Sequence, residues 1–410
     1  MYTKKLTENI ENDLKNISAN GKYKTERMIE GAQGARVIVG GREMLMFASN
    51  NYLGLANDPE LIKSAKEGLE KFGFGMASVR FLSGTQTIHR ELEKKIAEFI
   101  GTEDAIVYST NFMANLGFFA TITNDPLGTE GEYKDAIYSD ALNHASIIDA
   151  FKLCKKELVD KRIYPHGDLG ALEKFLADDT INPPAGGYRN KIIVTDGIFS
   201  MEGDSANLKK LTELAEKYEA LLFVDDAHGI GVMGEHGRGT PEAQGLLGKI
   251  DVISGTLGKG LGGAVGGYVG GKKDIVDFLR QKSRTYLFSN ALPASVAVAG
   301  ITALEMLTRD QSRIKNVQEN AKYFRDKLIE NNLPTLPGSH PIVPLMIGDA
   351  KKNSELSRAL FEQGIYATGL SFPVVPEGEA RIRFQISASH TKQMLDEAIE
   401  KIKTLYSEIK

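Results

Sequence analysis

Short apolar runs alternate with helix-compatible segments from about residue 60 to residue 290, and this alternation restricts the possible folds more than any other feature of the sequence. The runs are too short for buried helices and indicate buried strands. They are DAIVY, DAIYSD, KIIVTD, ALLFVDD and DVISG. Between the third and fourth runs, Leu208 and Leu211 share one face of a predicted helix that starts after Asn207. Strands that alternate with helices form a largely parallel sheet covered by helices, so we expect an α/β fold.

The chain of 410 residues is long enough for more than one domain, and its pattern changes twice. Residues 1–60 begin with a charged segment and end in the turn-like SNNYLG, which predicts an N-terminal arm. Residues 61–290 carry the alternation of strands and helices and form the predicted large domain. After that, long helical patterns, the strand-like ARIRFQIS and a closing helix predict a smaller α+β domain over residues 291–410.

The charge balance and the cysteine content exclude several classes of protein. Lys and Arg total 50 against 54 for Asp and Glu, so the net charge of −4 provides no broad basic surface for nucleic acid or an anionic membrane. No run approaches the roughly 18 apolar residues of a membrane span, and the first residues lack the apolar stretch of a secretory signal. The single cysteine, Cys154, excludes an intramolecular disulfide and fits a reducing compartment. We therefore expect a cytoplasmic protein with no membrane span and no nucleic-acid partner.

Polar side chains follow three of the predicted strands. The segments are Asp196–Ser200 after KIIVT, Asp225–His228 after ALLFV and Thr256–Lys259 after DVISG. Ligands of open α/β sheets bind beyond the carboxyl ends of the strands, so these segments are candidates for one shared site. Lys259 follows Asp225 by 34 residues (259 minus 225), which is enough for one connection and one further strand.

A lysine, a carboxylate and an imidazole at one site suit a pyridine aldehyde phosphate as cofactor. The Lys259 amine can form a Schiff base with the aldehyde, and Asp225 can keep the ring nitrogen protonated, with His228 close by. The hydroxyl of Thr256 and the backbone N–H groups of the turn at 109–115 are candidate phosphate ligands. On its own, a glycine-flanked lysine is more often a surface loop residue, so the combination carries the prediction.

Motifs along most of the chain resemble the α-oxoamine synthases, a branch of the fold-type I pyridoxal-phosphate enzymes. The similarity begins near Asn50 and runs through SNNYLGL, GTQTIHRELE, SDALNHASIIDA, DGIFSMEGD, VDDAHGIGVMG, GTLGKGLGG, YLFSN and ARIRFQISASHT. It implies a fold-type I PLP-dependent transferase, in which a large domain with a mostly parallel central sheet binds pyridoxal 5′-phosphate (PLP), next to a smaller α+β C-terminal domain. It also implies a homodimer with shared active sites.

The resemblance assigns residues to the PLP ring. Lys259 matches the Schiff-base lysine and Asp225 the partner of the pyridinium nitrogen. His228 and Ser200 match groups near the phenolic oxygen of the cofactor, and His144 matches the histidine that stacks on the ring. By itself, His144 would be interpreted as a structural histidine.

The resemblance also assigns residues to the PLP phosphate. Asn111 and Phe112 match the residues of the phosphate turn, and Thr256 matches a further ligand. Ser289 and Asn290 match contacts that the family donates across its dimer interface. The resemblance therefore predicts that each site needs two chains.

The small-molecule partners implied by the resemblance are an amino acid and an acyl-CoA. Arg383 matches the arginine that binds the amino-acid carboxylate, for which a planar guanidinium is suited, while Asn50 and His144 match residues close to this substrate. Arg381 would face the same side of a strand and is the competitor of Arg383. In the implied reaction the amino acid displaces Lys259, loses its α-proton to the freed lysine and attacks the thioester.

Two segments distinguish between the branches of the family. GFGMASVRF at 73–81 and the later FPVVPEGEARIR are similar to the branch that joins glycine to acetyl-CoA, giving 2-amino-3-oxobutanoate in threonine and glycine metabolism. The long loop at 123–134 and the turn TNFM depart from that branch. Two sister reactions stay open, which are alanine with pimeloyl-CoA and serine with palmitoyl-CoA. Outside the branch, an aminotransferase or a threonine aldolase would share the lysine and the aspartate.

A competing interpretation starts from a GxGxxG pattern at 229–234, with Asp251 about twenty residues further on. It would indicate a dinucleotide site, but the following EHGRGTPEAQG is too rich in Gly and Pro to begin a helix. The remaining histidines show no HExxH-like spacing, so we expect no metal. Cys154 has no obvious base beside it and is not expected to react.

Overall fold

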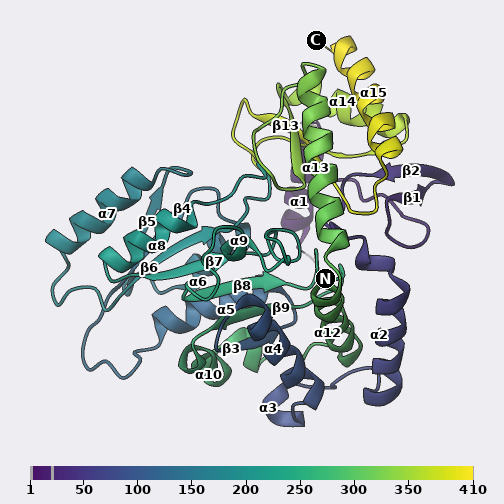
Figure 1. The fold of residues 1–410 in the computed structure, drawn as a ribbon. Helices are drawn as coiled ribbons and strands as arrows, with labels where there is room; N and C mark the ends of the chain where they lie inside the picture. The colour runs from purple at the N-terminus through teal and green to yellow at the C-terminus, as the bar shows by residue number, and fades with distance from the viewer. Residues whose placement is uncertain (1–2, 20–22, 410) are drawn as a thin grey trace.

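The computed structural model describes residues 3–19 and 23–409, and its main feature is a seven-stranded sheet (Figure 1). The strand order is β3-β9-β8-β7-β6-β4-β5. The strands are β3 (Asp104–Tyr108), β4 (Asp135–Asp140), β5 (Val159–Tyr164), β6 (Asn190–Asp196), β7 (Leu221–Asp225), β8 (Val252–Thr256) and β9 (Gly267–Gly271). β9 runs antiparallel to both of its neighbours, and the other pairs are parallel. The predicted α/β class with a mostly parallel sheet is confirmed.

Two strands of this sheet were not predicted. β5, with the sequence VDKRIY, alternates buried and more exposed residues at the sheet edge, so it lacks a continuous apolar run. β9, with the sequence GYVGG, is rich in glycine, which normally weakens a strand. Its glycines are required by close packing, because a Cβ at Gly270 would lie 2.5 Å from Ile100 Cδ1.

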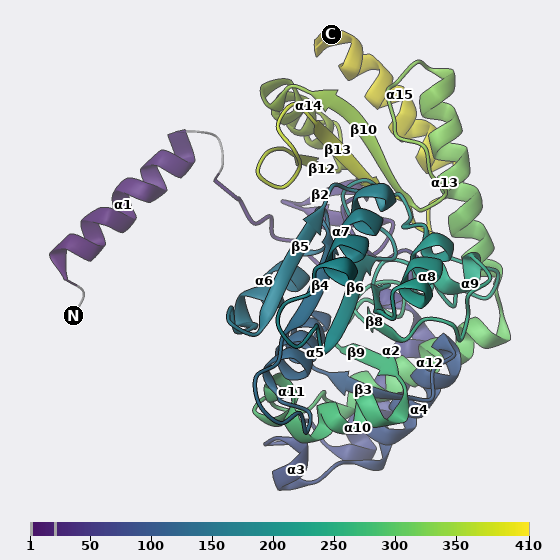
Figure 2. The ribbon, with the colours of Figure 1, turned by 90° about the vertical axis from the view of Figure 1, so that its left-hand side faces the viewer.

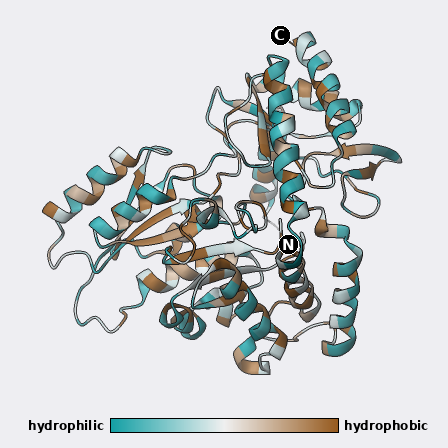
Figure 3. Ribbon diagram, viewed as in Figure 1, coloured by the Kyte–Doolittle hydropathy of each residue, from teal (hydrophilic) through white to brown (hydrophobic). Residues whose placement is uncertain are grey.

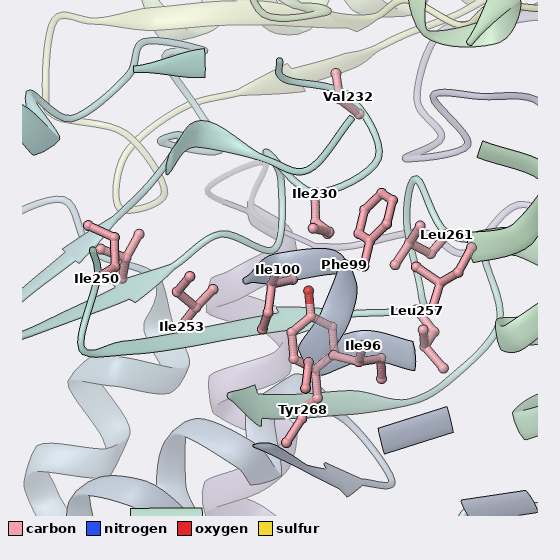
Figure 4. Close-up of a cluster of buried hydrophobic side chains, with 14 of the residues drawn as sticks. Ile96, Phe99, Ile100, Ile230, Val232, Ile250, Ile253, Leu257, Leu261 and Tyr268 are labelled. Carbon is pink, nitrogen blue, oxygen red and sulfur yellow. The ribbon is translucent and has the colours of Figure 1, made fainter. Parts of the chain in front are cut away.

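Alternating side chains of the strands build two apolar layers, one on each face of the sheet. On one face pack α4 (Thr87–Ile100), α7 (Leu169–Ile181), α8 (Leu208–Lys217) and α12 (Ala294–Arg309). On the other face pack α5 (Asn111–Asn124), α6 (Ala145–Leu153) and α10 (Lys273–Lys282). Figure 3 shows apolar strands between more polar helices, and Figure 4 shows Ile96 and Ile100 of α4 against Ile253 and Tyr268 of the sheet. The predicted helix after Asn207 is α8, and the Asn207 side chain accepts a hydrogen bond from Lys210 N.

The C-terminal part carries a second, smaller sheet of three antiparallel strands in the order β10-β13-β12, seen at the top of Figure 1. These strands are β10 (Ile342–Gly348), β12 (Thr368–Leu370) and β13 (Ala380–Gln385), and the helices beside them are α13 (Ser312–Glu330), α14 (Ala350–Glu362) and α15 (Lys392–Ile409). The long helical pattern near 295–332 is two helices, α12 and α13, separated at Asp310 and Gln311. α12 lies within the range expected for the small domain, but its buried side chains belong to the core of the large sheet. The three-part division with boundaries near 60 and 290 stays a proposal.

The N-terminal region joins both parts. α2 (Pro59–Phe72) packs along α12, while β1 (Arg36–Val39) and β2 (Arg42–Met46) form a small sheet with β11 (Ile365–Tyr366) of the C-terminal part. α1 (Lys4–Ala19) has no buried residue and projects away from the rest of the chain in Figure 2. The short elements are η1 (Leu55–Asn57), α3 (Arg80–Ser83), α9 (Thr240–Ala243) and α11 (Arg284–Leu287). In the described ranges, no helix has both the length and the apolarity needed to cross a membrane.

Candidate active site

The carboxyl ends of neighbouring strands bring the predicted site residues to one edge of the large sheet. β6 ends at Asp196 and β7 at Asp225, and these two residues are direct partners in the parallel register. β8 ends at Thr256, three residues before Lys259. β3 runs in the same direction as β8, because both are antiparallel to β9, so the turn after Tyr108 lies at this edge too. The three polar segments that follow β6, β7 and β8 therefore meet at this edge, as the strand pattern predicts.

Asp225 is buried and surrounded by hydrogen-bond donors. Its side chain is 4% exposed. Asn111 Nδ2 lies 3.2 and 3.0 Å from its two oxygens, Asn115 Nδ2 lies 2.6 Å from Oδ2, and Ala227 N donates to Oδ1 at 3.0 Å. These donors favour a negative charge on Asp225. The carboxylate is therefore prepared to face a cationic group on a ligand.

The turn from β3 into α5 presents backbone N–H groups at the same edge. Thr110 caps the helix, since its hydroxyl accepts a hydrogen bond from Met113 N at 3.2 Å. The N-terminus of this 14-residue helix offers N–H groups and the positive end of the helix dipole. The turn fits tightly on β9, because a Cβ added at Gly267 would lie 2.2 Å from Asn111 N. A phosphate group suits this position.

Replacing Gly267 by Ala should displace the turn and weaken phosphate binding. A distance of 2.2 Å to backbone cannot be kept, so the turn must move. Losing two backbone hydrogen bonds of about 1 kcal/mol each would raise the dissociation constant of a phosphate-bearing ligand about thirtyfold. Equilibrium dialysis with PLP measures this dissociation constant. Gly170→Ala is the matched control, because it lies exposed in α7 with its nearest atom at 3.3 Å, and equal dissociation constants for both variants would contradict the prediction.

Lys259 lies partly buried beside the acidic strand ends. Burial lowers the pKa of its amine to about 8, while the charges of Asp225 and Asp196 act in the opposite direction. A lysine with a pKa near 8 has a much larger neutral fraction at physiological pH than a surface lysine. The amine is therefore suited to act as a nucleophile and as a base.

His228 is held in a buried network of polar side chains. Tyr52 Oη lies 2.9 Å from His228 Nδ1 and 3.3 Å from Asn50 Oδ1, and Gln385 Nε2 donates to Asn50 Oδ1. His340 Nε2 lies 2.9 Å from the main-chain oxygen of His228. Burial and the nearby Lys259 amine lower the pKa of His228 well below its ordinary value. The imidazole is therefore neutral and oriented.

Two arginines of β13 point toward the loop after β6, as the spacing of two residues predicts. Arg381 is fully buried and already paired, because it donates to Glu202 at 3.0 Å and to Glu379 Oε2 at 2.7 Å. Arg383 donates from Nη1 to the main-chain oxygen of Ser200 at 2.8 Å, and its buried Nε is without a partner in the described part of the chain. The structure therefore leaves free donor capacity on Arg383, which favours it over Arg381 as the carboxylate-binding arginine.

The other predicted residues lie around the same edge. His144 caps α6, with its Nδ1 2.7 Å from Ser146 Oγ, and burial lowers the pKa of its imidazole. The Thr256 hydroxyl donates to Gly266 O at 2.9 Å, so its contact with a phosphate stays a prediction. Phe112 is 40% exposed in the first turn of α5. Ser109 Oγ donates to Asn290 O at 2.7 Å.

The position of Ser289 and Asn290 next to this turn is compatible with a role at a phosphate. Ser289 Oγ lies 3.9 Å from Met113 Sδ, close to the start of α5, and Asn290 is exposed. Whether they serve the site of a partner subunit stays a prediction.

Several contributors to the site were not identified from the sequence. They are Asn115, Tyr52, Gln385 and His340. Asn115 lies one helical turn after Asn111, a spacing that places both amides on one face of α5 and that could have been noticed. The other three come from distant segments, and their contacts depend on how the two sheets are packed.

The competing dinucleotide interpretation fails on the local structure. Gly229–Gly234 follows β7, but a dinucleotide fingerprint must open a helix directly, and the next helix is the four-residue α9 at Thr240–Ala243. The Asp251 side chain accepts a hydrogen bond from Leu222 N before β8 begins, where it helps to join two strands. This segment therefore has no place for a pyrophosphate.

A family model described as aminotransferase class I and II matches residues 42–402. The chain belongs to this family. It is 47% identical over 390 residues to 2-amino-3-ketobutyrate coenzyme A ligase of Escherichia coli K12, covering 95% of this chain and 94% of the relative. It is 43% identical to 8-amino-7-oxononanoate synthase of Thermosipho melanesiensis, covering 95% of each chain. The structure of serine palmitoyltransferase from S. paucimobilis with a bound PLP–myriocin aldimine matches with a TM-score of 0.88 at 28% identity, covering 100% of this chain and 99% of that one.

These similarities agree with the branch inferred from the motifs. The predicted membership of the α-oxoamine synthases is confirmed, and so is the fold-type I transferase architecture. The similarity to each of these two relatives extends over 95% of this chain and 94–95% of the relative.

Proposed function

We propose that this chain is a PLP-dependent acyltransferase that condenses glycine with acetyl-CoA to 2-amino-3-oxobutanoate and coenzyme A, a glycine C-acetyltransferase. The placement of Lys259 beside Asp225 at the edge of the sheet carries the proposal for the chemistry. The choice of branch is supported by the 47% identity to 2-amino-3-ketobutyrate coenzyme A ligase, together with GMASVRF and FPVVPEGEARIR.

The residues at this edge fit PLP. Asp225 offers a buried carboxylate to a protonated pyridine nitrogen, and the start of α5 offers N–H groups to a phosphate. Asn111 and Asn115 both turn their amide nitrogens toward Asp225, which holds the carboxylate in place. Lys259 provides the amine for the aldehyde, while His228 and Ser200 would lie near the phenolic oxygen and His144 on one face of the ring.

The side chains supply binding and proton transfer. PLP, when bound, supplies an aldehyde that reacts with amines and a ring that accepts electron density. Lys259 Nζ is the base that takes the α-proton of glycine, because its lowered pKa gives a neutral amine near physiological pH. Asp225 would keep the ring nitrogen of bound PLP protonated, and the network of His228, Tyr52 and Asn50 would keep neutral donors beside the substrate. The carbon that has lost its proton attacks the thioester carbonyl of acetyl-CoA, and the thiol of coenzyme A leaves.

Replacing Arg383 by Ala should weaken glycine binding and leave acetyl-CoA binding largely unchanged. A bidentate arginine–carboxylate contact contributes about 1.5 to 3 kcal/mol, so the KM for glycine should rise about ten- to a hundredfold. Steady-state kinetics with each substrate varied in turn checks this. Arg381→Ala is the matched comparison on the same strand, and a larger rise of the glycine KM in that variant would assign the carboxylate contact to Arg381.

A homodimer with shared sites is also part of this proposal. Large apolar side chains are exposed in two segments. Phe288 (65% exposed) directly precedes Ser289 and Asn290. The segment before α4, which includes α3, exposes Phe74 (91%), Phe81 (58%) and Leu82 (70%). Exposed apolar groups of this size mark contact surfaces between proteins. Light scattering at micromolar concentration tests the dimer, and an active monomer would refute the shared site.

We further expect the enzyme in the cytoplasm.

A substrate panel tests the function. Coenzyme A release by the PLP-loaded protein is measured with glycine, alanine and serine, each paired with acetyl-, pimeloyl- and palmitoyl-CoA. Release only with glycine and acetyl-CoA is the expected result. Release with alanine and pimeloyl-CoA, or with serine and palmitoyl-CoA, would assign the enzyme to a sister branch. Absence of release with every pair would favour an aminotransferase or a threonine aldolase.

A further inference from the structure

A second carboxylate is buried next to Asp225. Asp196 ends β6 and is the register partner of Asp225 at the end of β7, and the two side chains are 3% and 4% exposed. Backbones of neighbouring strands lie about 4.8 Å apart, so the two carboxyl groups share one poorly solvated region. Two adjacent buried carboxyl groups do not both ionise without a large cost. One of them is therefore expected to hold a proton.

The hydrogen bonds indicate which of the two holds it. Asp225 accepts from Asn111, Asn115 and the backbone N–H of Ala227, so its negative charge is well compensated. In the described part of the chain, the Asp196 side chain accepts from a single donor, the backbone N–H of His144, at 3.2 Å. Burial and the nearby Asp225 raise the pKa of Asp196 well above its ordinary value. The proton therefore belongs to Asp196.

Asp196 also connects the end of β6 to the loop that carries His144. Asp196 N donates to Asn143 Oδ1 at 2.8 Å, and Asn143 Nδ2 donates back to Val194 O at 2.9 Å. Together with the bond from His144 N to Asp196 Oδ1, these contacts clamp the start of α6 against β6. The place of the His144 ring thus depends on Asp196. Its titratable neighbours on the surrounding elements are Asp225, Lys259, His144 and Asp140.

We propose that Asp196 is a positioning residue which, as an uncharged carboxylic acid, holds the main chain of His144 and leaves Asp225 as the single negative charge facing the ring nitrogen of the cofactor. This inference rests on the cofactor site of the proposed function. The printed contact of its side chain is with the backbone N–H of His144, so the proposed role requires no contact with the reacting atoms. Asp196 acts by positioning His144 and, because it is uncharged, by leaving Asp225 as the single negative charge.

The variants Asp196→Asn and Asp196→Ala separate the two roles. Asn keeps an acceptor for His144 N and is uncharged, whereas Ala removes the acceptor. An unpaired buried N–H costs about 1 to 3 kcal/mol, so Ala should raise the dissociation constant of PLP about five- to a hundredfold, and Asn should restore it. Asp251→Asn at the opposite end of the sheet is the control.

The pH titration of the visible absorption of the PLP-loaded protein tests the charge. If Asp196 is uncharged, Asp196→Asn keeps the wild-type midpoint. If Asp196 were charged, its replacement by Asn would instead lower the midpoint of this titration by about 1 pH unit or more, because a nearby negative charge favours the protonated form of the lysine-bound cofactor. A midpoint lowered in this way, or a PLP affinity of Asp196→Asn as weak as that of Asp196→Ala, would overturn the proposal.

The protein without PLP gives an independent readout. A carboxyl group whose folded pKa lies above its unfolded value lowers stability as the pH rises above the unfolded value. Asn does not ionise, so Asp196→Asn should melt at a higher temperature than the wild type at pH 8, and the difference should shrink toward pH 4. A lower melting temperature at pH 8 would contradict an uncharged Asp196. If the wild type fails to bind PLP, the proposed function fails, while this melting comparison still decides the protonation of Asp196.

Discussion

Lys259→Ala should lower coenzyme A release by about 10⁴-fold, the upper end of what one acid–base group contributes. The variant loses the partly buried amine whose pKa of about 8 suits it for attack and for proton transfer. It should also lose the visible absorption of the lysine-bound cofactor, while it can still hold PLP through Asp225 and the start of α5. Absorption spectra and single-turnover kinetics with glycine and acetyl-CoA measure both effects.

The matched control is Lys272→Ala, which removes an exposed lysine thirteen positions further along the chain (272 minus 259). It should keep both the absorption and the turnover of the wild type. Turnover by Lys259→Ala within tenfold of the wild type would refute the assignment of this lysine, whatever its effect on the spectrum.

Asp225→Asn should lower turnover by about 10²- to 10⁴-fold. Asn keeps the shape of the side chain but removes the charge that stabilises a protonated pyridine nitrogen, and loss of one partner from a buried ion pair costs about 3 to 5 kcal/mol. The amides of Asn111 and Asn115 would also face a weaker acceptor. Steady-state kinetics and the dissociation constant of PLP measure the loss.

Asp251→Asn is the comparison for this prediction, because Asp251 lies before β8 at the opposite end of the sheet and is exposed. The neighbouring Asp196→Asn provides a second comparison through its absorption midpoint. If Asp225→Asn and Asp251→Asn turned over at the same rate, a role of Asp225 at the ring nitrogen would be contradicted.

The parts of the fold that the sequence predicted are those with strong local patterns. The buried runs such as DAIVY and ALLFVDD became β3 and β7, because a continuous apolar run has one stable place, inside a covered sheet. β5 and β9 were not predicted, because their stability depends on the elements packed against them and not on a local sequence pattern. β5 lies at the edge and carries charged residues, and β9 is rich in glycine because α4 and the turn at Asn111 approach it closely.

The same distinction applies to the site. Lys259 and Asp225 follow buried runs, so the geometry of a parallel sheet was sufficient to bring them together. Arg381 and Arg383 have equal positions in the alternation, and only their partners separate them, since Glu202 and Glu379 neutralise Arg381. Tyr52 meets His228 across 176 residues of sequence, and no local pattern predicts such a contact.

The most direct measurement of where the chemistry takes place is peptide mapping of the PLP-loaded protein after borohydride reduction, which makes the bond between the cofactor and its lysine permanent. The predicted result is a single modified peptide that contains Lys259, with the mass of the reduced cofactor added. A cofactor attached to another of the lysines, or a protein that takes up no label after incubation with PLP, would contradict the active site described above.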